Sequence, residues 1–226
     1  MTDDTLNRRL TAIAALLLTI FFIVGFLLPG APPKADDSLR EITHYLVHKR
    51  SSILAGDVFI GLAATFFLIF AAGLRRHLRG AGRTDDGLAD TAFAGAVAGI
   101  VLLLIGAGLL NGIAFKGAGL GEPVRAWFDA LNDIFFLSGF PLALFFGFSA
   151  WSGARSRAFP SWIAWLGWLT AIVQLMTGIG LFAKSGAFAS GGAFAFVPPL
   201  VGTIWALAIA VILWRGAGKA AASGSA

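Results

Sequence analysis

The sequence contains no cysteine among its 226 residues. This absence excludes disulfide bonds, thiolate metal ligands and cysteine nucleophiles. Charged residues are also scarce, at 13% of the chain, which is about half of their usual share in a soluble domain. Hydrophobic residues take their place, at 58% of the sequence, and the mean hydropathy is +0.82. Such a composition excludes an ordinary soluble domain and indicates a chain whose solvent is lipid.

Motifs for several chemistries are absent as well. No serine lies in a nucleophile elbow, and the sequence has no Walker-type phosphate loop and no zinc-protease helix motif. The net charge of +5 comes largely from basic residues that flank apolar runs, which is typical of membrane proteins and needs no nucleic acid. The sequence therefore gives no positive indication of an enzyme, a bound cofactor or a nucleic-acid partner.

Six apolar runs are long enough to cross the ~30 Å hydrocarbon core of a bilayer as helices, which takes about 20 residues each. A helix is the form in which every backbone amide of a lone span finds a partner within lipid. The runs cover residues 10–28, 53–74, 91–115, 134–151, 162–183 and 194–214. We predict an all-α integral membrane protein: residues 1–215 form one six-helix transmembrane domain. Residues 216–226, which lack apolar periodicity, form a disordered cytoplasmic tail.

The basic residues predict the orientation of this bundle. With the amino terminus in the cytoplasm, ten of the seventeen fall on the cytoplasmic side, and most of the others lie in one long outer loop. We therefore expect a cell-membrane protein, in a bacterial inner membrane, with both termini cytoplasmic. The ten residues are Arg8, Arg9, Arg75, Arg76, Arg79, Arg83, Arg155, Arg157, Arg215 and Lys219.

The long connection at residues 29–52 contains a helix signal. Ser38 is followed three residues later by Glu41, which is the spacing of a capping box at a helix amino terminus. Leu39, Ile42 and Leu46 then share one face. We predict a helix that starts after Ser38 and runs on into the second apolar run.

The third and fifth runs resemble each other at a fixed offset of 72 residues. Seven of fifteen positions are identical, where composition alone gives about one or two. The pattern predicts a duplicated helical hairpin, in which spans two and three correspond to spans four and five. The matched residues are Gly95, Ile100, Val101, Leu103, Gly106, Gly108 and Leu109 with Gly167, Ile172, Val173, Leu175, Gly178, Gly180 and Leu181.

Carboxylates at membrane depth are the strongest candidates for function, because they are costly there unless paired, hydrated or protonated. Asp57 lies near the start of the second run, and Asp129 and Asp133, one helical turn apart, lie just before the fourth. Asn111 is predicted at the same outer level. We expect these side chains to form an outward-facing acidic cavity that binds a ligand or a proton.

Two arginines are positioned to join this cavity. Arg50 lies two turns before Asp57 on the same side of the predicted helix, and Arg125 lies one turn before Asp129. The alternative interpretation is structural: acids at the start of a helix interact favourably with its dipole while remaining near water.

Two histidines, His44 and His48, are one turn apart, the spacing that lets two imidazoles share a metal. They are predicted to point away from Asp57, and neighbouring basic residues disfavour a bound cation. They remain weak metal candidates, and no metal site or cofactor is assigned.

Small residues at four-residue spacing indicate close helix packing or a homodimer contact, as at Gly95 with Gly99 and Gly108 with Gly112. Our first hypothesis is a protein that binds or transports a small solute, a proton or a lipid at the acidic cavity. The second is an accessory or sensory subunit that docks a partner membrane protein through glycine-rich helices. The third is an outer-leaflet metal-dependent enzyme using the acids, or His44 and His48.

The start of the fifth run carries one resemblance to a known group. Its residues are similar to the hairpin seen in uncharacterised multi-pass membrane proteins of high-GC bacteria. The resemblance implies a membrane location and transfers no functional residue. It rests on Phe159, Pro160, Ser161, Trp162, Trp165, Leu166 and Gly167.

Overall fold

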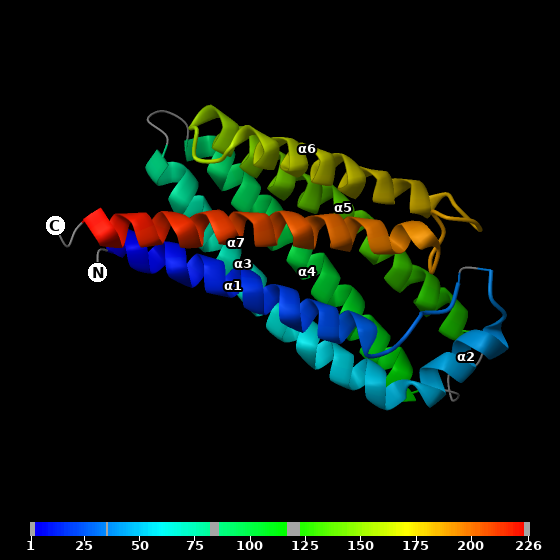
Figure 1. The fold of residues 1–226 in the computed structure, drawn as a ribbon. Helices are drawn as coiled ribbons and strands as arrows, with labels where there is room; N and C mark the ends of the chain where they lie inside the picture. The colour runs from blue at the N-terminus through cyan, green and yellow to red at the C-terminus, as the bar shows by residue number, and fades with distance from the viewer. Residues whose placement is uncertain (1–2, 35, 82–85, 117–122, 224–226) are drawn as a thin grey trace.

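The computed structural model describes residues 3–34, 36–81, 86–116 and 123–223. Within these ranges the chain is helical apart from its connections, and no strand occurs (Figure 1). The elements in order are α1 (Asp3–Leu27), α2 (Leu39–His48), α3 (Arg50–Ala81), α4 (Asp86–Lys116), α5 (Pro123–Arg155), α6 (Ser161–Met176), η2 (Thr177–Leu181), η3 (Ala193–Phe196) and α7 (Val197–Ser223).

Six of these helical segments are long and apolar enough to cross a membrane, which confirms the number and the place of the predicted apolar helices. They contain α1, α3, α4, α5, α6 with η2, and η3 with α7. Large apolar side chains cover their outside as well as their inside. Trp165 is 74% exposed, and Val58 is 63% exposed. An exposed apolar surface of this extent is what a protein surrounded by lipid presents.

The six long helices form a closed ring in which each contacts its neighbours in the order α1, α3, α4, α5, α6, α7 and back to α1. Helix α1 begins and α7 ends at the same end of this ring, which we call the terminal end (Figure 1). The short helix α2 lies at the other end, which we call the α2 end. The even number of long helices accounts for this arrangement.

Aromatic side chains fill the middle of the bundle. Trp205 of α7 has no exposed surface, and its ring meets Phe70 of α3 and Phe145 and Phe146 of α5 edge to face, at centroid distances of 5.2–6.3 Å. Its indole Nε1 donates a hydrogen bond to the Ile163 carbonyl of α6 at 3.2 Å. The central layer is therefore packed rather than open, and it separates the two ends of the bundle.

Glycines bring the matched third and fifth spans against one helix, α5. A Cβ on Gly95 of α4 would lie 2.6 Å from the Pro141 carbonyl, and one on Gly106 would lie 2.7 Å from the ring of Phe135. In α6, a Cβ on Gly167 would lie 2.7 Å from the Ala150 side chain. Shared contact with α5 is a physical reason for the similar glycine patterns. The duplication itself stays a prediction.

The predicted continuous helix from Ser38 into the second run is wrong at one position. The capping box forms as expected, with the Glu41 N–H donating to Ser38 Oγ and the Ser38 N–H donating to a Glu41 oxygen. However, α2 ends at His48, and Lys49 caps it through a hydrogen bond from its N–H to the Tyr45 carbonyl at 2.8 Å. The break at Lys49 lets α2 lie across the bundle instead of extending α3.

The predicted disordered tail is also wrong over most of its length. Helix α7 continues to Ser223, so residues 216–223 are helical, whereas residues 224–226 lie outside the described residues. Alanine has the highest helix propensity, and the run of alanines after Lys219 extends the helix without any apolar periodicity.

Candidate ligand site at the α2 end

Helix α2 covers the α2 end with one apolar face. Ile42 and Leu46 have no exposed surface, and they pack against residues of α3, α4 and α5. We call this group the α2 cluster. Its fully buried members are Ile42, Leu46, Ile53, Ile113, Ala114, Val124, Phe128 and Leu131, with Leu39, Tyr45, Leu109, Leu110 and Phe135 packed around them.

The register between α3 and α4 follows from contacts at the terminal end, where Arg75 and Asp90 meet. Asp57 lies eighteen residues before Arg75, and Gly108 lies eighteen residues after Asp90, which is about five full turns in both helices. Asp57 therefore faces α4 at about the level of Gly108. Asn111, about one turn further along α4, is also turned towards the α3 side.

Two oxygen atoms at this level are buried without a partner. Asp57 Oδ2 and Asn111 Oδ1 are shielded from solvent, and neither accepts a hydrogen bond from any described residue. Both belong to half-buried residues beside the α2 cluster, since Leu109 and Leu110 precede Asn111 and Ile53 lies one turn before Asp57. A buried acceptor without a donor costs about 1–3 kcal/mol, and a group that supplied N–H or O–H donors to these atoms would remove that cost.

Tyr45 of α2 places its phenol close to Asp57. Burial, together with a smaller effect of the negative charge of Asp57, raises the pKa of Tyr45 to about 12. The phenol is therefore neutral at physiological pH, close enough to Asp57 to experience its charge. Tyr45 is the only tyrosine in the chain.

Of the two predicted arginine partners, Arg125 lies beside Asp129 and Arg50 does not approach Asp57. The Arg50 guanidinium lies over the Phe115 ring, 4.4 Å from its centroid, so the expectation that it turns towards Asp57 is wrong. Phe115 of α4 lies opposite the start of α3 and offers the guanidinium an aromatic face. Arg125 lies 3.6 Å from Asp129, as predicted, and its Nη1 donates to the Asp37 carbonyl at 2.7 Å.

The other two acids do not join Asp57. Asp129 and Asp133 of α5 are both exposed, and 55% of the Asp129 side chain is accessible. The predicted meeting of three carboxylates in one outward-facing cavity is therefore wrong. Helix α5 turns Phe128 and Leu131 inward to the α2 cluster, which leaves Asp129 and Asp133 on its outer side. The alternative interpretation, acids at a helix start, holds only in part: both acids are exposed, but the first turn of α5 contains no acid.

The two histidines lie on the outer surface of α2, as predicted. Their rings stack at a centroid distance of 3.8 Å, and His48 Nδ1 lies 3.0 Å from the His44 carbonyl. They line an open, mostly apolar groove with Leu39, Arg40, Thr43 and Val47. No group of three or more metal-ligating side chains occurs in the described parts of the chain.

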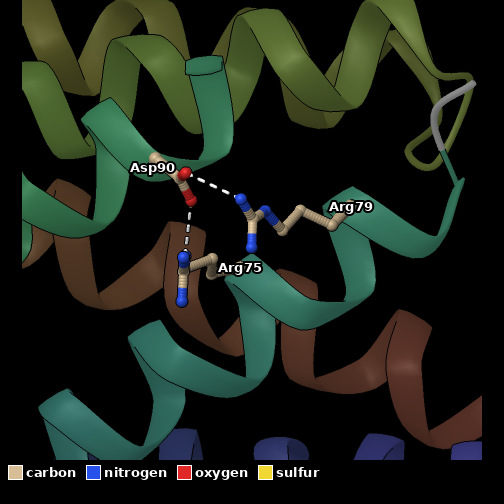
Figure 2. A network of polar contacts seen from close by, with 3 residues as sticks. All are labelled: Arg75, Arg79 and Asp90. Carbon is tan, nitrogen blue, oxygen red and sulfur yellow. Dashed lines mark hydrogen bonds and ion pairs between the residues drawn. The ribbon is translucent and has the colours of Figure 1, made fainter. Parts of the chain in front are cut away.

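An ion-pair network at the terminal end was not predicted. Asp90 of α4 accepts from Arg75 Nε at 2.6 Å and from Arg79 Nη2 at 2.8 Å, both on α3 (Figure 2). Arg75 also lies over the Phe93 ring. The sequence signal was Asp90 near the start of a basic-flanked span, but its partners are fifteen and eleven residues away. This network joins α3 to α4 and gives Asp90 the cationic partners that Asp57 lacks.

The chemistry available at the α2 end is acceptance of hydrogen bonds. Asp57 supplies negative charge, Asn111 an amide oxygen, and Tyr45 a phenol and an aromatic face. Calcium takes six to eight oxygen ligands and magnesium six, more than these three residues provide. A cation that carries its own N–H donors requires only two or three acceptors.

Comparison with known proteins gives no family for this chain. No family model matches it, and neither the curated proteins nor the solved structures include a significant match.

Proposed function

We propose that this chain crosses a bacterial inner membrane six times, with both termini in the cytoplasm, and binds a small cationic solute from the outer side at Asp57, Asn111 and Tyr45. The single observation that carries the proposal is the pair of buried, unpartnered acceptors, Asp57 Oδ2 and Asn111 Oδ1. A carboxylate in apolar surroundings is retained at such a cost mainly where it meets a ligand or a proton.

The distribution of basic residues supports this orientation. The terminal end carries the ends of α1, α3, α5 and α7, and the excess of arginine on these segments favours the cytoplasm. The α2 end then faces outwards, and the site lies beneath α2 at the outer level of the bilayer. The packed aromatic layer around Trp205 supports binding at one end rather than an open channel.

Tyr45 offers a reporter for the binding test. Replacing tyrosine by 3-fluorotyrosine throughout the protein gives one ¹⁹F nucleus, at this position. Purified protein in lipid nanodiscs is titrated with sodium, potassium and ammonium chlorides at constant ionic strength. The pH is held fixed, because every carboxylate takes up a proton at some pH.

We expect at least one of these cations to shift the Tyr45 signal saturably, with an apparent affinity at least about tenfold weaker in Asp57→Asn. Asp129→Asn is the matched control, because it makes the same change at an exposed position of the predicted repeat. The proposal fails if no cation shifts the signal, or if Asp57→Asn and wild type respond alike.

Orientation is tested with single cysteines, since the chain has none of its own. Ser185→Cys lies in the exposed connection at the α2 end, and Ala81→Cys at the terminal end. A membrane-impermeant maleimide added to intact cells should label the first and not the second. Labelling of Ala81→Cys alone would contradict the proposed orientation.

A further inference from the structure

The space beside Asp57 indicates which cation would fit. A Cβ added at Gly61 of α3, or at Gly108 or Gly112 of α4, would meet no atom within 4 Å. Gly61 lies one turn after Asp57 on the same face, and Gly108 lies at the Asp57 level of the facing helix. By contrast, Gly95 and Gly106 of α4 are tightly covered by α5. The α3–α4 contact is thus open beside the unpartnered carboxylate.

This open strip leads to the apolar outside of the bundle. Gly108 and Gly112 are exposed, and so are their neighbours Ile105, at 52%, and Leu104, at 40%. On α3, Val58 next to Asp57 is 63% exposed. A ligand whose polar end reaches Asp57 would therefore have its other end against aliphatic side chains and, in a membrane, against lipid tails.

We infer that the site binds a primary alkylammonium ion, with its –NH₃⁺ group at Asp57 and Asn111 and its aliphatic chain in the glycine-lined strip between α3 and α4. This inference rests on the proposed function and names its ligand class. Three N–H donors match two unpartnered acceptors with one to spare, and charge complementarity comes from a carboxylate that no described cation approaches within hydrogen-bond distance.

Tyr45 and the glycine-lined strip would recognise different parts of the ligand: the ammonium group and the alkyl chain. The face of the Tyr45 ring favours an adjacent ammonium, which a neutral head group would not gain. The strip favours a longer chain, because each methylene removed from water strengthens binding by about two- to fourfold. A quaternary ammonium has the charge but no N–H donor, and an alcohol has the chain but no charge.

The test uses the same fluorotyrosine-labelled protein in nanodiscs, titrated with butylammonium, methylammonium, tetramethylammonium and 1-butanol. We expect a saturable shift with butylammonium, weaker binding of methylammonium, and no Asp57-dependent shift with the other two. Partitioning into lipid is measured with Asp57→Asn and subtracted. Asn111→Leu should weaken the binding of butylammonium about tenfold. The control Asn132→Leu, the same substitution on α5, should leave this affinity unchanged.

The strip is tested separately. Gly108→Leu should weaken butylammonium more than methylammonium, because the new side chain occupies the space of the alkyl chain. Gly80→Leu, at an equally open glycine at the other end of α3, should change neither. Equal losses for both amines, or no loss in Gly108→Leu, would overturn the placement of the chain.

The outcomes separate this inference from the function on which it rests. Equal binding of tetramethylammonium or 1-butanol would overturn the alkylammonium inference. So would a response to inorganic cations that depends on Asp57 but is not shared by butylammonium, and in that case the proposed cation site would stand. The absence of any Asp57-dependent response to inorganic or organic cations would overturn both.

Discussion

Two half-buried aspartates on facing helices have opposite surroundings. Asp90 of α4, at the terminal end, is held by two arginines at 2.6 and 2.8 Å (Figure 2). Asp57 of α3, about five turns away, has a buried oxygen without any partner. The ion pairs of Asp90 join α3 to α4, whereas Asp57 Oδ2 accepts no hydrogen bond from the described residues. The difference shows that Asp90 joins two helices, and it supports the proposal that Asp57 meets a ligand.

The largest expected effect comes from a substitution that weakens the packing of α2 against the α2 end. Leu46 is fully buried, so Leu46→Ala should cost about 2–5 kcal/mol of the free energy that docks α2. The exposed neighbour Val47 gives a control, Val47→Ala, that should cost far less. Hydrogen exchange should show faster exchange at residues 39–48 in Leu46→Ala, with the terminal end unchanged. Uniformly faster exchange would contradict the independence of the two ends.

The two aspartates should respond in opposite directions to the same substitution. Asp90→Asn removes a charge that two arginines share and should lower the thermal midpoint in nanodiscs. Asp57→Asn removes an unpaired charge and adds N–H donors beside Asn111, so it should be neutral or stabilise by about 1 kcal/mol. A loss of stability in Asp57→Asn as great as in Asp90→Asn would show that Asp57 also has a structural partner.

The ionisation of Tyr45 tests whether the charge of Asp57 lies close to it at the α2 end. Its pKa is raised to about 12, mainly by burial and further by Asp57, so the folded state prefers the neutral phenol. This contribution to stability is complete below pH 10.0, the ordinary value, and is lost as pH rises through about 12. Near-ultraviolet absorbance should show tyrosinate forming at a lower pH in Asp57→Asn, yet still above 10.0, because burial is the larger cause.

The smallest effect concerns the start of α2. Hydrogen bonds from the Ser38 side chain and backbone hold the pKa of Glu41 below its ordinary value of 4.5. Their contribution is present above pH 4.5 and is lost as pH falls through the lowered folded value. Ser38→Ala should therefore speed hydrogen exchange in the first turn of α2 at neutral pH and do so less in acid, where only the hydrogen bond from the Glu41 N–H to Ser38 Oγ is lost. An equal effect at both pH values would contradict a charged capping box.

The long helices could be predicted because their signal is local. An apolar run of about 20 residues has few other solutions, and Ser38 with Glu41 marks a helix start within four residues. The pairing of Arg125 with Asp129 was predictable for the same reason, since the two are one turn apart.

The site could be predicted only in part, because its partners come from different helices. Asp57 and Asn111 were candidates from their depth in apolar runs, but Tyr45 was not, since it approaches them only after the chain breaks at Lys49. Arg50 contacts Phe115, which belongs to another helix and could not be assigned to it from local spacing. Asp129 and Asp133 face outwards because α5 buries its phenylalanine and leucine side instead, and Asp90 finds arginines through the α3–α4 register.

The most direct test of the central claim is the reaction of the two aspartates with dicyclohexylcarbodiimide, an apolar reagent that modifies carboxyl groups in apolar surroundings. After treatment in nanodiscs, mass spectrometry should find the adduct at Asp57 and not at Asp90, and butylammonium should protect Asp57. Modification of Asp90 at a similar rate, or an inert Asp57, would contradict the claim that Asp57 is the carboxylate left open for a ligand.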